Sequence, residues 1–220
     1  MRILSCVITI LLMSATSATL ATDAEQWRLE KDKNGVQVYS RAVEGWSIRE
    51  IRGVTAVPAS LSSVVAVVTD VAALPEVTGV VARASIRSRE SDTHYQVYSV
   101  VAMPWPVSDR DILNQREIRQ DPNTLTVTVT DIATRDVMPP QNGLVRMVNS
   151  RQRWTLTPRP DGSVLAEMCT LSEPAGPIPA AVINVMSVSM PFHTLKMLRE
   201  MVQRETYAHA RLAFIKEQAD

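Results

Sequence analysis

Apolar and polar residues alternate along much of the chain between residues 80 and 172. Strict alternation puts successive side chains on opposite faces of a strand, so it predicts a sheet with one buried and one exposed face. Turn-forming clusters of Gly, Pro, Asn, Asp and Ser separate the runs, and a spacing of about ten residues per strand favours an antiparallel meander. The expected strands cover residues 80–89, 94–102, 111–119, 124–133, 145–158 and 163–172.

Helical periodicity is found on both sides of this meander. Before it, Ser60 is a good N-cap for a short helix that ends near Asp70. After it, apolar residues recur at helical spacing from residue 182 to residue 202, and Pro191 is expected to kink or split that helix. The other expected elements are an amphipathic helical segment at 27–33, strands at 36–41 and 47–57, and a short helix or turn at 71–77.

These elements predict an α+β fold. A sheet of this size must bury its apolar face, and the last helix is the only expected element long enough to cover it. No internal repeat and no long linker divides the chain, so residues 22–220 are expected to form a single domain.

The first residues have a different character. Arg2 supplies a positive charge, residues 3–13 are apolar, and small residues follow up to Ala21, before the first acid at Asp23. This order is that of a secretory signal peptide, and the apolar run is shorter than the roughly 20 residues that span a bilayer. We expect residues 1–21 to be cleaved from an exported protein, most simply in a bacterial periplasm. An uncleaved N-terminal anchor is the alternative.

Composition excludes several classes of protein. Hydrophobic residues make up 45% of the chain, charged residues make up 21%, and the formal net charge is zero, which is typical of a globular protein and not of a nucleic-acid binder. The seven glycines form no phosphate-binding or nucleophile-elbow motif. His94, His193 and His209 lack the spacing of metal ligands, and Cys169 is expected to be core or pocket lining. We therefore expect no catalytic activity, no cofactor and no metal.

Three segments resemble the START (StAR-related lipid transfer) domain family, in the family's order. Residues 104–111 together with Arg116 resemble its loop-and-strand signature, and residues 138–146 resemble the segment before a strand that carries Val-Arg. Residues 173–184 are similar to the Gly-x-Ile-Pro start of its gripping helix. The resemblance, over about residues 25–205, implies a helix-grip fold: a curved antiparallel sheet wrapped around a long C-terminal helix, with an internal apolar cavity that holds one lipid.

The resemblance also assigns a cavity-facing role to Arg116, as a polar anchor. The family often pairs this arginine with an acid from the preceding strand, and residues 94–102 contain no acid. Because an unpaired buried arginine is costly, Arg116 either pairs elsewhere or waits for an anionic or hydroxylated head group. On this basis Arg116→Leu is expected to weaken lipid loading more than thermal stability. The other candidate ligand-binding residues are Asn114, Val97, Ser99, Met168, Ile183, Met186 and Met190.

A second group of residues is expected at the mouth of the cavity. Trp105 lies between two prolines in a loop that the resemblance places there, which suits a gate and a probe of the bilayer interface. A Trp packed permanently over the helix is the alternative. The candidate gate and membrane-contact residues are Met103, Trp105, Val107 and Ile178, and those expected to brace the loops by ion pairs are Arg110, Asp111 and Arg146.

The sequence thus predicts a monomer that binds one lipid or sterol-like ligand and carries or sequesters it in an aqueous compartment, with transient membrane contact. Two alternatives remain open at this stage. One is a cavity enzyme of the same superfamily, of the cyclase or hydrolase type, which acts on an apolar substrate. The other is an interaction module whose pocket has become a filled core.

Overall fold

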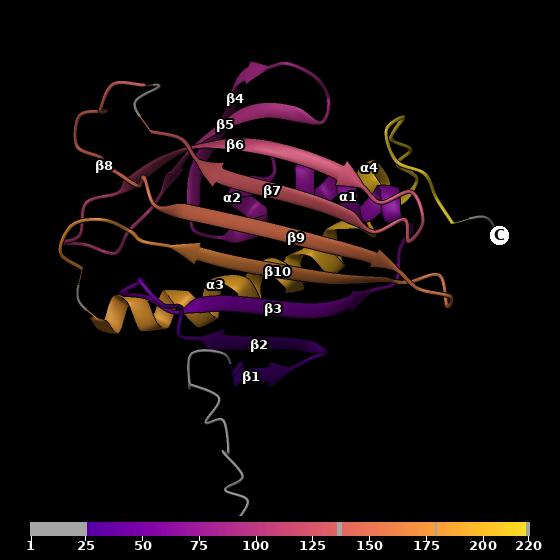
Figure 1. Cartoon of the computed structure of the whole chain (residues 1–220), viewed down its shortest axis with the longest axis horizontal. Coiled ribbons are helices and arrows are strands. Elements are labelled where there is room, and N and C mark those ends of the chain that lie inside the picture. The colour runs from indigo at the N-terminus through magenta and orange to yellow at the C-terminus, as the bar shows by residue number, and fades with distance from the viewer. Residues whose placement is uncertain (1–25, 136–137, 179, 219–220) are drawn as a thin grey trace, which may run out of the picture.

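The computed structural model describes residues 26–135, 138–178 and 180–218, so the expected signal peptide at 1–21 lies outside the described residues. The described part contains ten strands and four helices (Figure 1). The strands are β1 (Arg28–Lys33), β2 (Val36–Arg41), β3 (Glu50–Val57), β4 (Val81–Arg89), β5 (His94–Val101), β6 (Arg110–Gln120), β7 (Val127–Ala133), β8 (Val145–Arg146), β9 (Ser150–Pro158) and β10 (Val164–Ser172). The helices are α1 (Leu61–Thr69), α2 (Leu74–Thr78), α3 (Ala180–Met201) and α4 (Glu205–Ala208).

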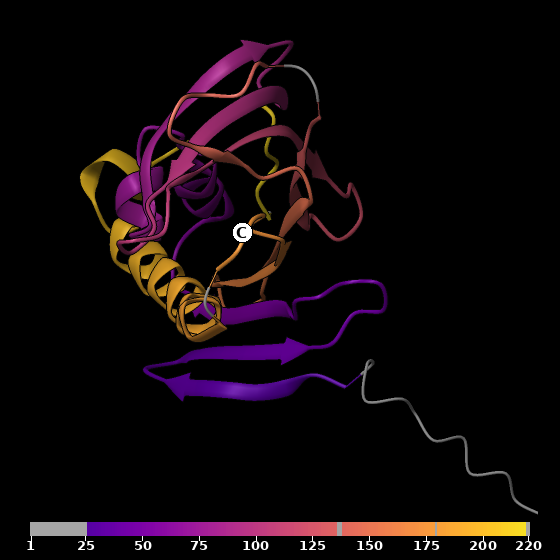
Figure 2. The ribbon, with the colours of Figure 1, turned by 90° about the vertical axis from the view of Figure 1, so that its left-hand side faces the viewer.

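The strands form one curved sheet in the order β1-β2-β3-β10-β9-β7-β6-β5-β4. All neighbours along this path are antiparallel, and the short β8 pairs with β6 in parallel. From β4 onward the long strands pair in chain order, which confirms the expected α+β fold with an antiparallel sheet and a C-terminal helix. Figure 2 shows the sheet as a curve with α3 on its concave side.

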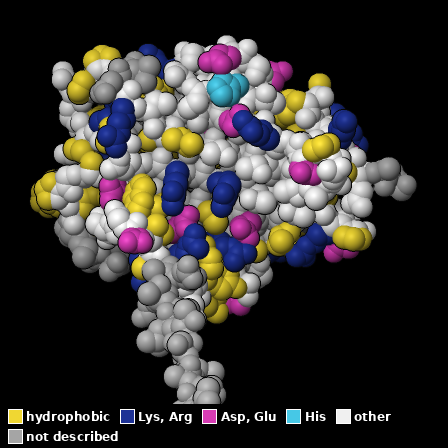
Figure 3. Space-filling view, viewed as in Figure 1, with side chains coloured by type: hydrophobic (Ala, Val, Ile, Leu, Met, Phe, Trp, Pro, Cys, Tyr) yellow, Lys and Arg dark blue, Asp and Glu magenta, His cyan; other side chains and the backbone are white. Residues whose placement is uncertain are grey.

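The outer face of the sheet is polar where β9, β10 and β3 run. Lys and Arg side chains gather on this face (Figure 3). On β9, Arg151 and Arg153 are exposed. Their inward neighbours on the same strand, Trp154 and Leu156, are buried. The period-2 alternation of the sequence therefore corresponds to one face in water and one in the interior.

A glycine lets α3 approach the sheet closely. A Cβ atom on Gly53 of β3 would lie 2.6 Å from Cδ1 of Leu195 on α3. Leu195 and Leu198 are fully buried, and they join α1 and the inner faces of β9 and β10 in one hydrophobic core. The core is therefore packed around the C-terminal half of α3.

Two of the expected elements were wrong. Residues 28–33 form strand β1 instead of part of a helix, because their backbone pairs with β2 at the sheet edge and this pairing overrides local propensity. Residues 145–158 form two strands, since β8 follows β6 while β9 turns to pair with β7. Of the two effects expected of Pro191, a kink or a split, the split is not found, because α3 continues through Pro191 to Met201.

Candidate functional site

A cavity of about 230 Å³ lies between α2, the N-terminal half of α3 and the concave face of the sheet. The packed core surrounds the C-terminal half of α3, and the cavity lies beside its N-terminal half. Most of the cavity wall is apolar. The apolar side chains come from α3 (Ile183, Met186, Met190), from β5 and β6 (Val97, Val101, Ile112), and from α2, the segment after it and the start of β4 (Leu74, Val80, Val81).

Strand alternation also brings polar side chains to this wall. On β6, Ile112, Asn114 and Arg116 point inward in turn, and on β5 Val97 and Ser99 do the same. These residues, expected from the sequence to meet a ligand, are brought together by the structure. So are Ile183, Met186 and Met190 of α3.

Met168 is the exception among the ligand-binding candidates. It points inward from β10 but lies opposite Trp154 in the packed core, with 1% of its surface exposed. The alternating pattern gives the correct face of the strand for Met168. It does not give the depth at which the core closes, because the packing of α1 and α3 determines that.

Arg116 forms an ion pair with Asp131 of β7, the strand after its own. Nε and Nη2 of Arg116 donate to the two carboxylate oxygens of Asp131 at 2.8 Å each, and both residues are almost fully buried. Burial lowers the pKa of Arg116, but the Asp131 carboxylate outweighs this effect, so the pKa lies above its ordinary value. Of the two possibilities left by the sequence, pairing elsewhere is the one found. Asp131 was missed, although it alternates in phase with the buried Val127 and Val129.

The ion pair belongs to a polar row that crosses the sheet. Thr170 of β10 lies opposite Gln152 of β9, Gln152 lies opposite Asp131, and Asp131 lies opposite Arg116. Thr170, Gln152, Asp131 and Arg116 all line the cavity. The next row toward the mouth adds a pair of hydroxyls, Ser150 and Ser172, whose oxygens are 2.5 Å apart. Neither row was predicted from the sequence.

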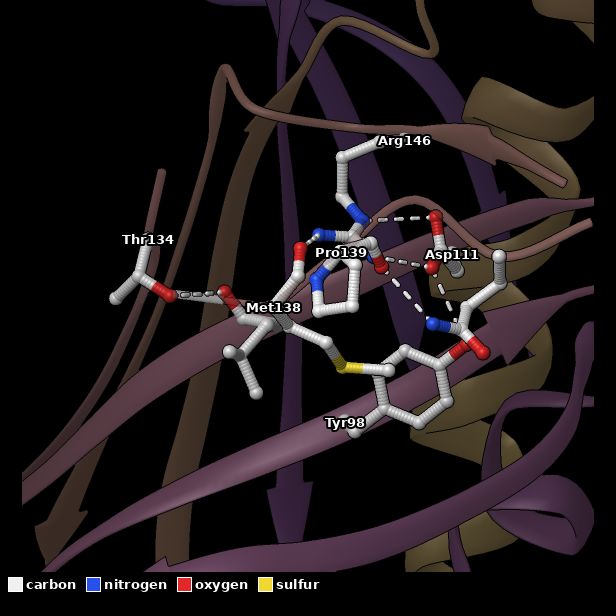
Figure 4. A network of polar contacts seen from close by, with 8 residues as sticks. Tyr98, Asp111, Thr134, Met138, Pro139 and Arg146 are labelled. Carbon is white, nitrogen blue, oxygen red and sulfur yellow. Dashed lines mark hydrogen bonds and ion pairs between the residues drawn. The ribbon is translucent and has the colours of Figure 1, made fainter. Parts of the chain in front are cut away.

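A second buried ion pair holds the loop after β7 (Figure 4). Nε and Nη2 of Arg146 donate to Asp111 at 2.9 and 2.7 Å, and the Tyr98 hydroxyl donates to Asp111 at 3.1 Å. Nη1 of Arg146 donates to the Met138 carbonyl at 3.1 Å. Burial, and then the neighbouring Asp111 carboxylate, raise the pKa of Tyr98. Asp111 and Arg146 thus lie in the bracing role that the sequence indicated.

Arg110 was expected in an ion pair and has none in the described part of the chain. It is 2% exposed, and its guanidinium donates to the backbone carbonyls of Pro174 and Ala175 at 3.0 Å each and to that of Ser108. The reason is geometric. Neighbouring residues on a strand point to opposite faces, so Arg110 points to the loop before α3 while Asp111 points to Arg146. Burial lowers the pKa of Arg110.

The loop between β5 and β6 lies at one end of the cavity. Met103 lines the cavity, as does Ile178 just before α3, whereas Val107 does not. Trp105 is 93% exposed, so its ring projects into solvent instead of packing over α3 as a permanent lid. Asp109 accepts a hydrogen bond from the backbone N–H of Met103 at 2.9 Å and closes the base of the loop.

Within residues 26–135, 138–178 and 180–218, no three His, Cys, Asp or Glu side chains are grouped so that they could hold a metal ion. No helix within these ranges combines the length and the apolar character needed to cross a bilayer.

A curved sheet that grips one long helix over an internal cavity defines the helix-grip class of proteins. The START domain profile matches residues 11–207, and the chain belongs to the START domain family.

Solved structures of the same fold and a sequence relative are similar to this chain. A STAR-related lipid transfer protein from Xanthomonas axonopodis is 34% identical, with a TM-score of 0.73 over 81% of this chain and 99% of the other. Human StAR-related lipid transfer protein 5 is 18% identical and shares the fold, with a TM-score of 0.74 over 83% of this chain and 88% of the other. An uncharacterized protein from Pseudomonas aeruginosa is 29% identical over 181 residues, which are 82% of this chain and 89% of that protein.

Proposed function

We propose that this protein binds one lipid in its internal cavity and carries it, chemically unchanged, through an aqueous compartment as a monomer. The hollow between α3 and the sheet is the observation that carries the proposal. Apolar surface moved from water into such a site gains about 25 cal/mol per Å², so a wall of Val, Ile, Leu and Met favours an apolar occupant over water. The lipid transfer protein that is 34% identical supports the same role.

Loading requires a route into the cavity, and we assign it to the loop between β5 and β6 together with the start of α3. Met103 and Ile178 lie at this end of the cavity, and Trp105 presents an exposed indole beside them. An indole is suited to the interface between lipid and water, because it combines a large apolar surface with one N–H donor. In the proposed cycle the loop opens at a membrane, a lipid enters, the loop closes, and the lipid is released at another membrane.

The compartment is proposed from the N-terminal segment. Its charge, short apolar run and small-residue stretch are those of a signal peptide, which supports export, most simply to a bacterial periplasm. A carrier is useful there because a lipid has to cross water between two membranes.

Native mass spectrometry of the purified protein tests the binding role. We expect a copurifying lipid on the wild-type chain and its loss in Ile183→Trp, which fills the cavity from α3. The matched control is Ile132→Trp, the same substitution at a site that is 55% exposed on the outer face. It should keep the lipid. Protein that is empty in all three forms, before and after incubation with vesicles, would contradict the proposal, and a chemically altered lipid would indicate an enzyme.

Quenching of tryptophan fluorescence by brominated lipid tests the membrane contact separately. Vesicles of brominated phosphatidylcholine should quench the wild-type protein, and Trp105→Phe should abolish most of this quenching. Trp46→Phe is the control, because Trp46 is half-buried and stacked against Arg151 with 5.5 Å between the guanidinium and the ring centre. If Trp105→Phe is quenched as strongly as the wild-type protein, the assigned loop does not touch the membrane.

A further inference from the structure

Three uncharged polar side chains on the cavity wall have no hydrogen-bond partner among the described residues. Ser99 is 6% exposed, and no bond to its hydroxyl is formed. Oδ1 of Asn114 is buried and unpartnered. The half-buried amide of Gln152 also forms no hydrogen bond within the described residues. Buried polar groups in proteins are almost always bonded, and each one left unpaired costs free energy. Ser99 and Asn114 therefore indicate that something else bonds to them when the cavity is occupied.

Ser99 and Asn114 are close enough to hold one group between them. Ser99 lies opposite Ile112 in the pairing of β5 with β6, and Asn114 is two residues further along β6 on the same face. Such diagonal neighbours are about 7–8 Å apart, so one oxygen placed between the two side chains can reach both. Gln152 lies on the other side of Asp131, further across the sheet.

The charged groups of the wall, in contrast, are already bonded to oxygen atoms of the protein. Arg116 is paired with both oxygens of Asp131. At the mouth, Arg49 donates to the Ser40 hydroxyl, which in turn donates to Glu30. Arg110 donates to three carbonyls, and the nearest acid acting on it is Asp109.

An anionic head group beside Arg116 would therefore find no free counter-charge. A carboxylate or phosphate placed beside Arg116 would also meet the negative charge of Asp131, and an unpaired buried charge is costly. A hydroxyl has neither problem. It donates one hydrogen bond and accepts others, so it satisfies the Asn114 amide and the Ser99 hydroxyl together.

On the basis of the proposed lipid-binding function, we infer that the ligand is an uncharged amphiphile whose hydroxyl is bound between Ser99 and Asn114, with its apolar part against α3. Long-chain or ring-based alcohols fit this description, whereas fatty-acid anions and lipids that bury a phosphate do not. Arg116 and Asp131 then shape the cavity without binding the head group.

Displacement of the neutral fluorescent dye N-phenyl-1-naphthylamine tests the inference with two probes of equal chain length, decan-1-ol and decanoate, at pH 8. Decan-1-ol should displace the dye at a concentration at least about tenfold lower than decanoate, because the anion loses its hydration without gaining a counter-charge. Equal displacement by the two probes would overturn the inference, as would stronger displacement by decanoate.

Two variants locate the effect. Asn114→Leu keeps a similar side-chain volume without the amide. It should weaken the binding of decan-1-ol by about two- to tenfold, the range expected for one net hydrogen bond. Ser99→Ala should act in the same direction with little risk to folding, and Asn123→Leu, in an exposed turn, is the control that should behave as wild type. If the preference for the alcohol survives both cavity variants, bound water satisfies the three groups and the inference is wrong.

The same experiment separates this inference from the proposed function. If the dye does not bind, or binds Ile183→Trp as well as wild type, the cavity is not a binding site and the lipid-binding proposal is wrong. If the dye binds in the cavity and decanoate displaces it as well as decan-1-ol does, lipid binding stands and only the assignment of the head group is lost.

Discussion

Removing one half of the Arg116–Asp131 pair should destabilise the fold severely. Arg116→Leu leaves the Asp131 carboxylate, which is 4% exposed, without its two hydrogen bonds. Breaking a buried pair from one side typically costs about 3–5 kcal/mol, and Asp131→Leu should cost a similar amount because it leaves the guanidinium unpaired. The double variant removes both charges and should recover most of the loss. This changes the order of effects that the sequence indicated, since stability should fall at least as much as loading.

Urea denaturation followed by circular dichroism measures these effects, because an unchanged slope with a lower midpoint reports a loss of stability. The two single variants and the double variant form a thermodynamic cycle. Because the double variant should recover most of the loss, the coupling energy in this cycle should exceed the loss in either single variant. Arg204→Leu is the control. Arg204 pairs with Glu76 at 2.5 Å on the surface, where water and salt screen the pair, so its midpoint should barely move. Single losses below about 1 kcal/mol, or losses that simply add in the double variant, would refute the reasoning.

Two further outcomes are expected. Gly53→Ala should cost about 1–3 kcal/mol in thermal or urea denaturation, because its Cβ would lie 2.6 Å from Cδ1 of Leu195; a cost near zero would mean that α3 shifts freely on the sheet. Burial and the hydrogen bond to Asp70 raise the pKa of Tyr207 to about 12. Since an unfolded tyrosine ionises near pH 10, the folded protein should lose stability between pH 10 and 12, and Tyr207→Phe should lose less over that interval; equal losses would contradict this.

The sequence predicts those parts of the fold in which one face of the sheet is exposed to solvent and the other is buried. The alternating pattern located the long strands of the meander, because each presents polar residues to solvent and apolar residues to the interior. Residues 27–33 were assigned wrongly because β1 is an edge strand whose pattern is set by its pairing with β2. No local signal in that segment distinguishes the two states.

The site could be predicted less completely, for a related reason. Alternation assigns a residue to a face, so Asn114 and Ser99 were placed correctly on the inner side. It carries no information about depth, so Met168 was expected in the cavity although it lies in the core. Asp131 could have been predicted in the same way, since it lies on the inward face of β7. The START resemblance, however, implies a partner for Arg116 on the strand before β6, whereas Asp131 lies on the strand after it.

The hollow itself follows from the order of rows across the sheet. One inward-facing row, formed by Met168, Trp154, Val129 and Ile118, is apolar and tightly packed. The second row lies next to it on the side of the cavity mouth and is polar; it is formed by Thr170, Gln152, Asp131 and Arg116. Gln152 of the second row forms no side-chain hydrogen bond within the described residues, and Met186 and Met190 of α3 offer at most weak thioether acceptors, so closing the helix onto this row would bury the Gln152 amide unpaired. The core therefore stops at the boundary between the two rows, and the space beyond it remains available for a ligand that brings its own polar group.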